Sequence, residues 1–232
     1  MNNTASDNLH YYSDEKKFLV ATDCVIFGFE VDKLKVLFQR RTIEPNLGCP
    51  TPLGGFVKDD ESVDDAAYRI LNERTGIKDI YLSQVETFGA IDRDPGARVI
   101  SVVYCALIDK LKHSVSMMNR FQCQWYDIDQ LPELYFDHSE MVEKALAYLR
   151  DAISHSPIAL NLLPRFFTLT NLQKLYESIQ GRELDKRNFR KRIGEMPYFV
   201  KTDRVDKSSS KRGACLYTFD KKMYRNIGNF HI

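Results

Sequence analysis

The stretch from Gly54 to Ile77 combines a glycine turn, an acidic loop and an amphipathic helix, and this pattern could place carboxylates around a cation. Positions 70, 73 and 74 would share one helix face, because residues three and four apart are neighbours. Three carboxylates there would hold a hard cation such as Mg²⁺, which polarises phosphate and activates water. This chain has Ile70, Glu73 and Arg74 at those positions, so we expect no metal.

The same stretch resembles the Nudix box, G-x5-E-x7-R-E-U-x-E-E-x-G-U, in which U is a bulky aliphatic residue. The resemblance implies an α/β/α sandwich, the fold of hydrolases that cut diphosphates with carboxylate-bound cations. Ile70 and Arg74 replace two of the three glutamates. We therefore predict that hydrolysis is lost, with no catalytic residues, metal or cofactor; an active diphosphate hydrolase is the alternative. The positions that match in register are Gly55, Glu61, Arg69, Leu71, Glu73, Gly76 and Ile77.

Charge is distributed unevenly along the chain. The 232 residues carry a net charge of only +1. Residues 157–232 hold 16 basic and 7 acidic side chains, a charge of +9, whereas residues 1–156 hold 17 basic and 25 acidic ones, a charge of −8. This asymmetry predicts two domains with different partners. A basic domain of this size indicates nucleic acid, and a merely solvated basic surface is the alternative.

Composition and cysteine use indicate a globular protein in a reducing compartment. No apolar run approaches the roughly 20 residues of a membrane span, and the first residues lack the layout of a signal peptide. The five cysteines are scattered and form no Cys-x-x-Cys pair, which argues against zinc and disulfides. We expect a cytoplasmic protein without a membrane partner.

Residues 1–156 show the alternation expected of an α/β domain. Glu30 to Lys33 is typical of a hairpin turn, and a helix at 139–154 closes the domain. His155-Ser156-Pro157 is the predicted boundary, because proline ends one helix and allows another to begin. Strands are expected at 18–29, 34–41, 80–91, 99–108 and 122–126.

Residues 157–232 have the order helix, helix, basic helix and β-hairpin, which predicts an α+β winged helix-turn-helix domain. A short helix is expected at 158–164, then Asn171–Gln180 with Thr170 as its cap, then a basic helix at 185–193. The hairpin strands are expected at 198–201 and 214–219. A solvated surface helix is the alternative for the basic helix.

A basic helix held on such a scaffold can enter the major groove, while the loop of the hairpin lies on phosphates. The helix supplies Arg and Asn, which can bond guanine and adenine, together with further cations. The loop supplies lysines and an arginine. The predicted DNA contacts are Lys186, Arg187, Asn188, Arg190, Lys191, Lys207, Lys211 and Arg212.

Both halves together resemble the Nudix-related transcriptional regulators of the NrtR and AraR group. The motifs are Leu169-Thr-x-Leu-Gln-x-Leu-Tyr-Glu177, Leu184-Asp-Lys-Arg-Asn-Phe-Arg190 and Gly213-x-x-Leu-Tyr-x-Phe219. The resemblance implies a homodimer on a near-palindromic operator, with the Nudix-like domain as sensor and dimer platform. NrtR-type members sense ADP-ribose, and AraR-type members sense L-arabinose.

Loss of two metal ligands favours L-arabinose over ADP-ribose, so an AraR-like repressor of L-arabinose utilisation genes is expected. An NrtR-type regulator of NAD metabolism is the alternative, because Arg74 could meet phosphate directly. Sugar hydroxyls need carboxylates, amides and arginines around an enclosed pocket. In other readings, Arg93–Asp94 is a surface turn and Asp137 a helix cap. The predicted effector contacts are Gln39, Arg41, Gly54, Glu73, Arg93, Asp94 and Asp137.

Overall fold

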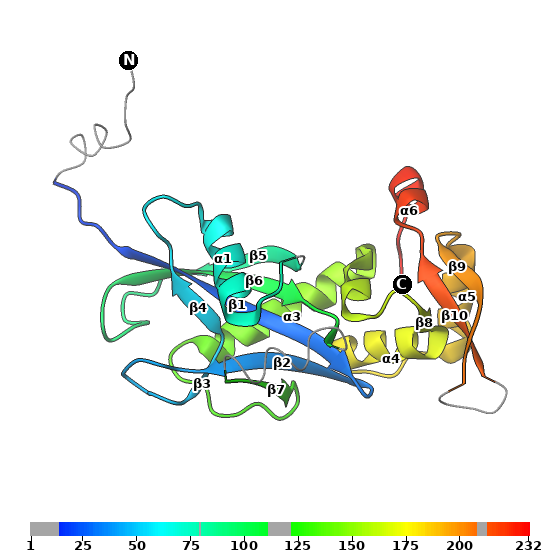
Figure 1. Cartoon of the computed structure of the whole chain (residues 1–232), viewed down its shortest axis with the longest axis horizontal. Coiled ribbons are helices and arrows are strands. Elements are labelled where there is room, and N and C mark those ends of the chain that lie inside the picture. Colours follow the sequence, from blue (N-terminus) through cyan, green and yellow to red (C-terminus); the bar gives the residue numbers. More distant parts are fainter. Residues whose placement is uncertain (1–13, 79, 111–121, 208–212) are drawn as a thin grey trace, which may run out of the picture.

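The computed structural model describes residues 14–78, 80–110, 122–207 and 213–232. Its first half contains a seven-stranded sheet in which the order β3-β2-β1-β6-β5 is extended by β4 on β1 and β7 on β2 (Figure 1). β1 and β6 are parallel, whereas the other pairs are antiparallel. The strands are β1 (Leu19–Glu30), β2 (Lys33–Arg40), β3 (Pro50–Thr51), β4 (Leu53–Phe56), β5 (Tyr81–Phe88), β6 (Val99–Leu107) and β7 (Cys123–Asp127).

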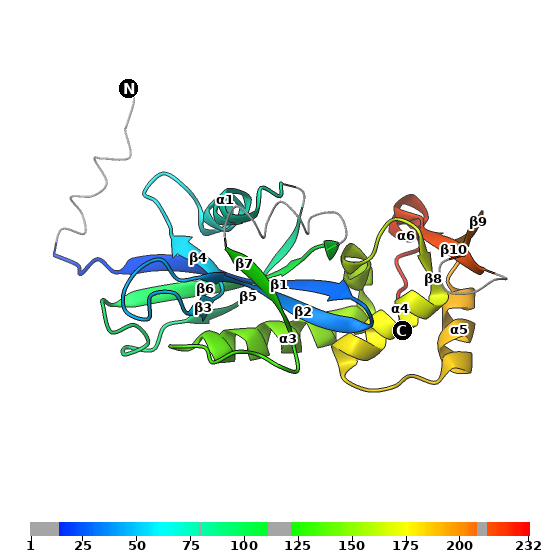
Figure 2. The ribbon, with the colours of Figure 1, turned by 60° about the horizontal axis from the view of Figure 1, so that its bottom comes forward.

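Two helices cover opposite faces of this sheet, α1 (Val63–Thr75) and α3 (His138–His155) (Figure 2). Leu71 of α1 is fully buried in one apolar cluster, and Leu149 of α3 is fully buried in another. Each helix turns one apolar face to the sheet, as its 3.6-residue period predicts. The expected α/β/α sandwich is therefore confirmed.

The turn between β1 and β2 has the expected hairpin form. Val31 and Asp32 have φ angles of 47° and 66°, and Glu30 pairs with Lys33 across them. Two consecutive positive φ angles are typical of a type I′ turn, whose twist matches that of the flanking strands. The hairpin is thus short and stiff, and its tip reaches toward the second half of the chain.

The second half is a winged helix fold, as predicted. Its three-stranded sheet has the order β8-β10-β9, and it contains a basic helix, α5, that follows α4 (Figure 1). No helix in the described ranges combines the length and apolar character that a bilayer crossing requires. The elements are η2 (Pro157–Leu162), β8 (Phe167–Thr168), α4 (Leu169–Gln180), α5 (Lys186–Glu195), β9 (Phe199–Asp206), β10 (Ala214–Phe219) and α6 (Lys221–Ile227).

Several predicted boundaries in this half are wrong. The cap of α4 is Thr168, whose hydroxyl accepts from Asn171 N at 3.0 Å, and Thr170 lies inside the helix. The short helix expected at 158–164 is a 3₁₀ helix over Pro157–Leu162. β9 continues to Asp206 because β10 pairs with it that far. Strand β8 and helix α6 were not predicted at all; β8 is too short to show a periodic pattern.

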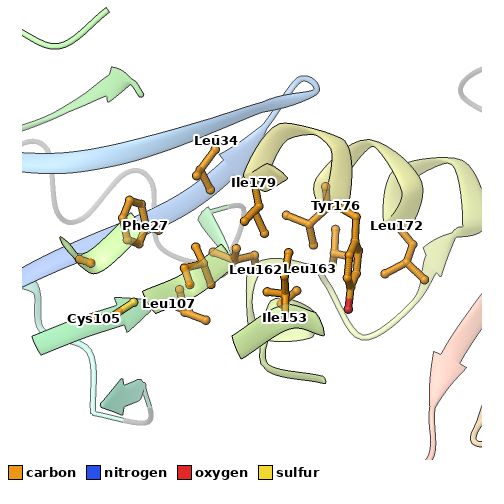
Figure 3. Packing of buried hydrophobic residues seen from close by; sticks show 14 of the residues in the cluster. Phe27, Leu34, Cys105, Leu107, Ile153, Leu162, Leu163, Leu172, Tyr176 and Ile179 are labelled. Carbon is orange, nitrogen blue, oxygen red and sulfur yellow. The ribbon is translucent and has the colours of Figure 1, made fainter. Parts of the chain in front are cut away.

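One apolar core joins the two halves of the chain (Figure 3). Leu34 of β2 and Ile153 of α3 lie in the same buried cluster as Ile179 of α4. Around it, Arg150 Nε donates to the Ile179 carbonyl oxygen at 2.8 Å. The side chains of Lys174 and Asp32 form an ion pair between α4 and the tip of the β1–β2 hairpin. The boundary between 156 and 157 stays a prediction, because this core is continuous across it.

Replacement of Thr168 by Ala should lower the free energy of unfolding by about 1 kcal/mol, because α4 loses its side-chain cap. Thr170→Ala is the matched control: the residue is exposed, so its effect should stay within about 0.5 kcal/mol. Urea denaturation followed by circular dichroism measures both. Equal effects would show that Thr168 is not the cap.

Candidate functional site

The helix of the Nudix-like stretch is fixed at both ends by local chemistry. The Ser62 side chain accepts from Asp65 N at 3.1 Å, and Gly76 closes the helix with a φ angle of 75°. Only glycine adopts that left-handed conformation without strain. Serine is a preferred residue at the start of a helix and glycine just past its end, so the amino-acid sequence itself indicates both ends.

Arg69 holds the loop that precedes this helix. Its guanidinium donates to both carboxylate oxygens of Glu61 at 2.8 and 2.5 Å, and to the Phe56 carbonyl oxygen at 3.0 Å. The hydrogen bonds from Arg69 hold the pKa of Glu61 at about 2. Glu73 is a weaker second partner of Arg69 at 3.3 Å. Glu61 and Arg69 therefore brace the end of β4. Gly54 and Gly55 lie within this strand and pair with β1, so the glycine turn expected from the sequence is wrong.

A pocket of about 400 Å³ opens beside this brace. It lies between β1, β2, β4, α1, the segment that precedes β6 and the start of α3. Six of the seven predicted effector contacts line it, and Asp137 lies just behind the wall. The six are Gln39, Arg41, Gly54, Glu73, Arg93 and Asp94. That they bind a ligand remains a prediction.

Arg93 is buried in the wall of the pocket. Its guanidinium donates twice to the Asp137 carboxylate, at 2.7 and 2.8 Å, and the two side chains are only 6% and 16% exposed. The backbone does turn here, because Arg93 N donates to the Ala90 carbonyl oxygen at 3.4 Å, but the Arg93 side chain points into the protein and not to the surface. Asp137 occupies the cap position of α3, but its side chain makes no capping hydrogen bond. This pair ties the segment before β6 to α3.

Two other predicted effector contacts, Arg41 and Asp94, already form hydrogen bonds within the protein. Arg41 Nε donates to the carbonyl oxygens of Ile43 and Pro45 at 3.1 and 2.7 Å, and its guanidinium lies 5.0 Å from the ring centre of Phe136. Asp94 accepts from Gly96 N at 2.7 Å and shapes a turn. A ligand in the pocket could therefore bond only the polar atoms of Arg41 and Asp94 that these hydrogen bonds do not use.

Asp23 and His138 also line the pocket, although neither was among the predicted contacts. Ser101 Oγ donates to Asp23 at 2.5 Å. A Cβ atom on Gly54 would lie 2.1 Å from the same carboxylate, so only glycine fits there. Burial lowers the pKa of His138, although the negative charge of Asp23 acts in the opposite direction and raises it. The sequence signal that could have identified Asp23 is its place as a single acidic residue within the apolar run of β1.

Positions 70, 73 and 74 all reach the pocket, as the helix periodicity predicts. Ile70 is buried, and a Cβ atom on Gly55 would lie 3.1 Å from its Cδ1. Glu73 is engaged with Arg69. Arg74 has no ion-pair partner among the described residues, and the same residues contain no group of three His, Cys, Asp or Glu that could hold a metal ion. The pocket therefore presents a free cation where the motif has a carboxylate.

The basic helix α5 offers a second candidate surface. Phe189 and Ile193 anchor it in the core, and Phe189 contacts the ring of Tyr176 with centroids 5.9 Å apart. Asp185 caps it by accepting from Asn188 N at 2.8 Å. The predicted contacts Lys186, Arg187, Asn188, Arg190, Lys191 and Lys207 are all exposed. Lys211 and Arg212 lie outside the described residues.

Comparison with known proteins identifies both halves. Residues 17–145 match the family model of the NUDIX domain, and residues 159–219 match that of the NrtR DNA-binding winged helix domain. The chain belongs to the Nudix-related, NrtR-type transcriptional regulators. An NrtR-type relative from Acinetobacter baylyi, described as an ADPR responsive transcriptional repressor, is 34% identical over 89% of this chain and 84% of its own length.

Solved structures agree with this NrtR-type architecture. Shewanella oneidensis NrtR complexed with a 27mer DNA is 27% identical, has a TM-score of 0.80, and covers 91% of this chain and 97% of its own. The NUDIX domain of that protein, complexed with ADP ribose, is 30% identical with a TM-score of 0.53, and covers 63% of this chain and 99% of its own. These two relatives give no support to the expected AraR-like subtype.

The buried pair Arg93–Asp137 should contribute strongly to stability. Asp137→Asn leaves the Arg93 charge unpaired and should lower the free energy of unfolding by about 3 kcal/mol. Glu86→Gln breaks the pair with Lys144, whose side chains are 46% and 44% exposed, and should cost less than about 1 kcal/mol. Denaturant titrations of the two variants measure the difference, and similar losses would contradict the assignment of Arg93–Asp137 as a buried brace.

Proposed function

We propose that this chain is a DNA-binding repressor controlled by ADP-ribose, which binds in the pocket beside α1. The observation that carries the proposal is Arg74, a half-buried cation of the pocket without an ion-pair partner among the described residues. A diphosphate can neutralise this charge directly, by charge-assisted hydrogen bonds that are stronger than neutral ones. The descriptions of the Acinetobacter and Shewanella relatives support the same ligand.

The pocket suits ADP-ribose better than the L-arabinose that the sequence favoured. Its volume of about 400 Å³ is in the range of pockets for ligands much larger than one pentose. Arg41, Arg69 and Arg93 line it too but bond groups of the protein itself, whereas Arg74 has no ion-pair partner among the described residues and a neutral sugar gives no reason for this cation. In this proposal Gln39, Glu73 and Asp94 bond ribose hydroxyls. The two missing metal ligands argued against a phosphate ligand, but in this proposal the positive charge of Arg74 takes the place of the metal ion.

We further propose that the pocket binds without hydrolysis. Cleavage of a diphosphate needs a metal that polarises the phosphate and activates water. Ile70 supplies no oxygen and is packed against Gly55, while Arg74 places a positive charge in the region where a cation would need carboxylates. The surviving Glu73 is shared with Arg69. Regulation rather than catalysis is therefore the proposed role of this domain.

The DNA-binding part of the proposal rests on α5. Its exposed side chains include three types that read or contact DNA, Arg, Lys and Asn, on a helix that α4 supports from behind. Two such helices in a homodimer would address half-sites about 34 Å apart. ADP-ribose would release the operator if it binds more tightly to a dimer geometry that no longer fits this spacing.

Arg74→Ala should weaken ADP-ribose binding by about tenfold to a hundredfold, the range expected when one charged hydrogen-bond partner is lost. Isothermal titration calorimetry with ADP-ribose measures this, and L-arabinose should give no heat. Lys144→Ala, on the far helix α3, is the matched control and should bind as the unmodified protein does. Binding of L-arabinose alone, or release of AMP in the presence of Mg²⁺, would contradict the proposal.

Arg190→Ala should weaken binding to a preferred duplex by about 1–3 kcal/mol if the side chain reads a base, and should reduce selectivity over random DNA. Fluorescence anisotropy with a duplex enriched from random sequence by the unmodified protein, and with an unselected duplex, provides both values. Lys144→Ala again serves as control. Unchanged selectivity would show that Arg190 does not contact bases.

A further inference from the structure

Two arginines of the winged helix lie against the ring of one phenylalanine. The guanidinium carbon of Arg204 is 4.2 Å from the ring centre of Phe166, and that of Arg165 is 5.3 Å from it. Both arginines are exposed, and Phe166 is half-buried. A cation over an aromatic face is attracted by the ring quadrupole, so the ring holds both charges in defined positions.

The stack joins segments that are distant in sequence. Arg165 and Phe166 immediately precede β8, whereas Arg204 lies on β9, and β10 separates these two strands in the sheet (Figure 1). The Arg204 side chain therefore extends across the sheet instead of pointing freely into solvent. Neither arginine has an ion-pair partner in the part of the chain that the structure describes. Two like charges are thus gathered without an acid between them.

The position of this stack points to its ligand. β9 leads from the end of α5 toward Lys207, so Arg204 lies between the basic helix and the predicted wing loop. The domain around it carries a charge of +9. Duplex DNA presents one phosphate charge per about 1.7 Å of its axis, and guanidinium groups match phosphate oxygens by paired hydrogen bonds.

We propose that Arg165 and Arg204, aligned on Phe166, form a clamp for a backbone phosphate of the duplex that α5 binds. The inference rests on the proposed function, since it requires that this domain binds duplex DNA. A phosphate clamp fixes the position of the protein on DNA but reads no sequence. It therefore predicts a uniform loss of affinity on all duplexes, in contrast to a base-reading residue of α5.

The test compares Arg165→Gln, Arg204→Gln and Phe166→Leu with the full-length unmodified protein. The probes are the enriched duplex and an unselected duplex of the same length. Fluorescence anisotropy measures the affinity of each protein for both duplexes at several salt concentrations. Each Arg→Gln change should reduce the slope of log affinity against log salt by about 0.9, so the affinity ratio between about 50 and 200 mM salt shrinks roughly 3.5-fold. Selectivity between the two duplexes should not change.

Phe166→Leu keeps both charges and removes the aromatic face. It should weaken both duplexes about twofold to fivefold, the effect of an exposed cation–π contact, with the salt slope retained. Circular dichroism and the unfolding midpoint establish that each variant is folded, and Lys144→Gln controls for the loss of a cation elsewhere. A Phe166→Leu protein with unchanged affinity would show that the ring does not organise a clamp.

The outcomes separate this inference from the proposed function. Unchanged affinity and salt slope in both Arg→Gln variants, with selectivity still lost in Arg190→Ala, would overturn the clamp alone. A selective loss on the enriched duplex would also overturn it, because the arginines would then read bases. Absence of any duplex binding by the unmodified protein would overturn the proposed function and the clamp together.

Discussion

The apolar junction between the two halves is the constraint on which the rest of the structure depends. Leu34, Ile153 and Ile179 come from the sheet, from α3 and from α4, and all three are buried in one cluster (Figure 3). Protein interiors are packed as densely as organic crystals and shift between discrete arrangements rather than deforming smoothly. The position of α4, and of the basic helix that it carries, is therefore set by the Nudix domain.

Two elements run from the pocket to this junction. β2 has Gln39 at the pocket and Leu34 at the junction, and α3 begins beside Asp137 and ends beyond Ile153. From the junction, contacts continue to the basic helix: Tyr176 packs on Phe189, and both Gln173 and Glu177 of α4 bond the backbone of Leu184. The pocket and the helix that we propose as DNA reader are thus connected through packed elements rather than a flexible linker.

Most of the residues of the Nudix-like stretch that match the motif have structural tasks in this domain. Gly76 ends the helix at a positive φ angle, and Leu71 and Ile77 are buried in the core. Arg69, paired with Glu61, braces the end of β4. Each of these residues has a structural task that remains whether or not a metal binds. Position 70 is filled by a buried isoleucine that packs against Gly55, whereas Arg74 at the other changed position lines the pocket.

The sequence by itself determined the hairpin turn, the cap at Ser62, the basic helix and the replacement of two motif glutamates, because each depends on residues a few positions apart. The sandwich followed from the resemblance of the whole stretch to a known family. Only the tertiary structure decided which charges pair. Arg93 and Asp137 are 44 residues apart, and Asp23 and Ser101 are 78 apart. The stack of Arg204 on Phe166 likewise spans β10, the strand that separates β9 from β8. Local propensity carries no information on such partners, since they meet only when the sheets and helices have packed. For the same reason the sequence favoured a sugar from the missing carboxylates, whereas the folded pocket is lined by Arg74, which has no ion-pair partner among the described residues.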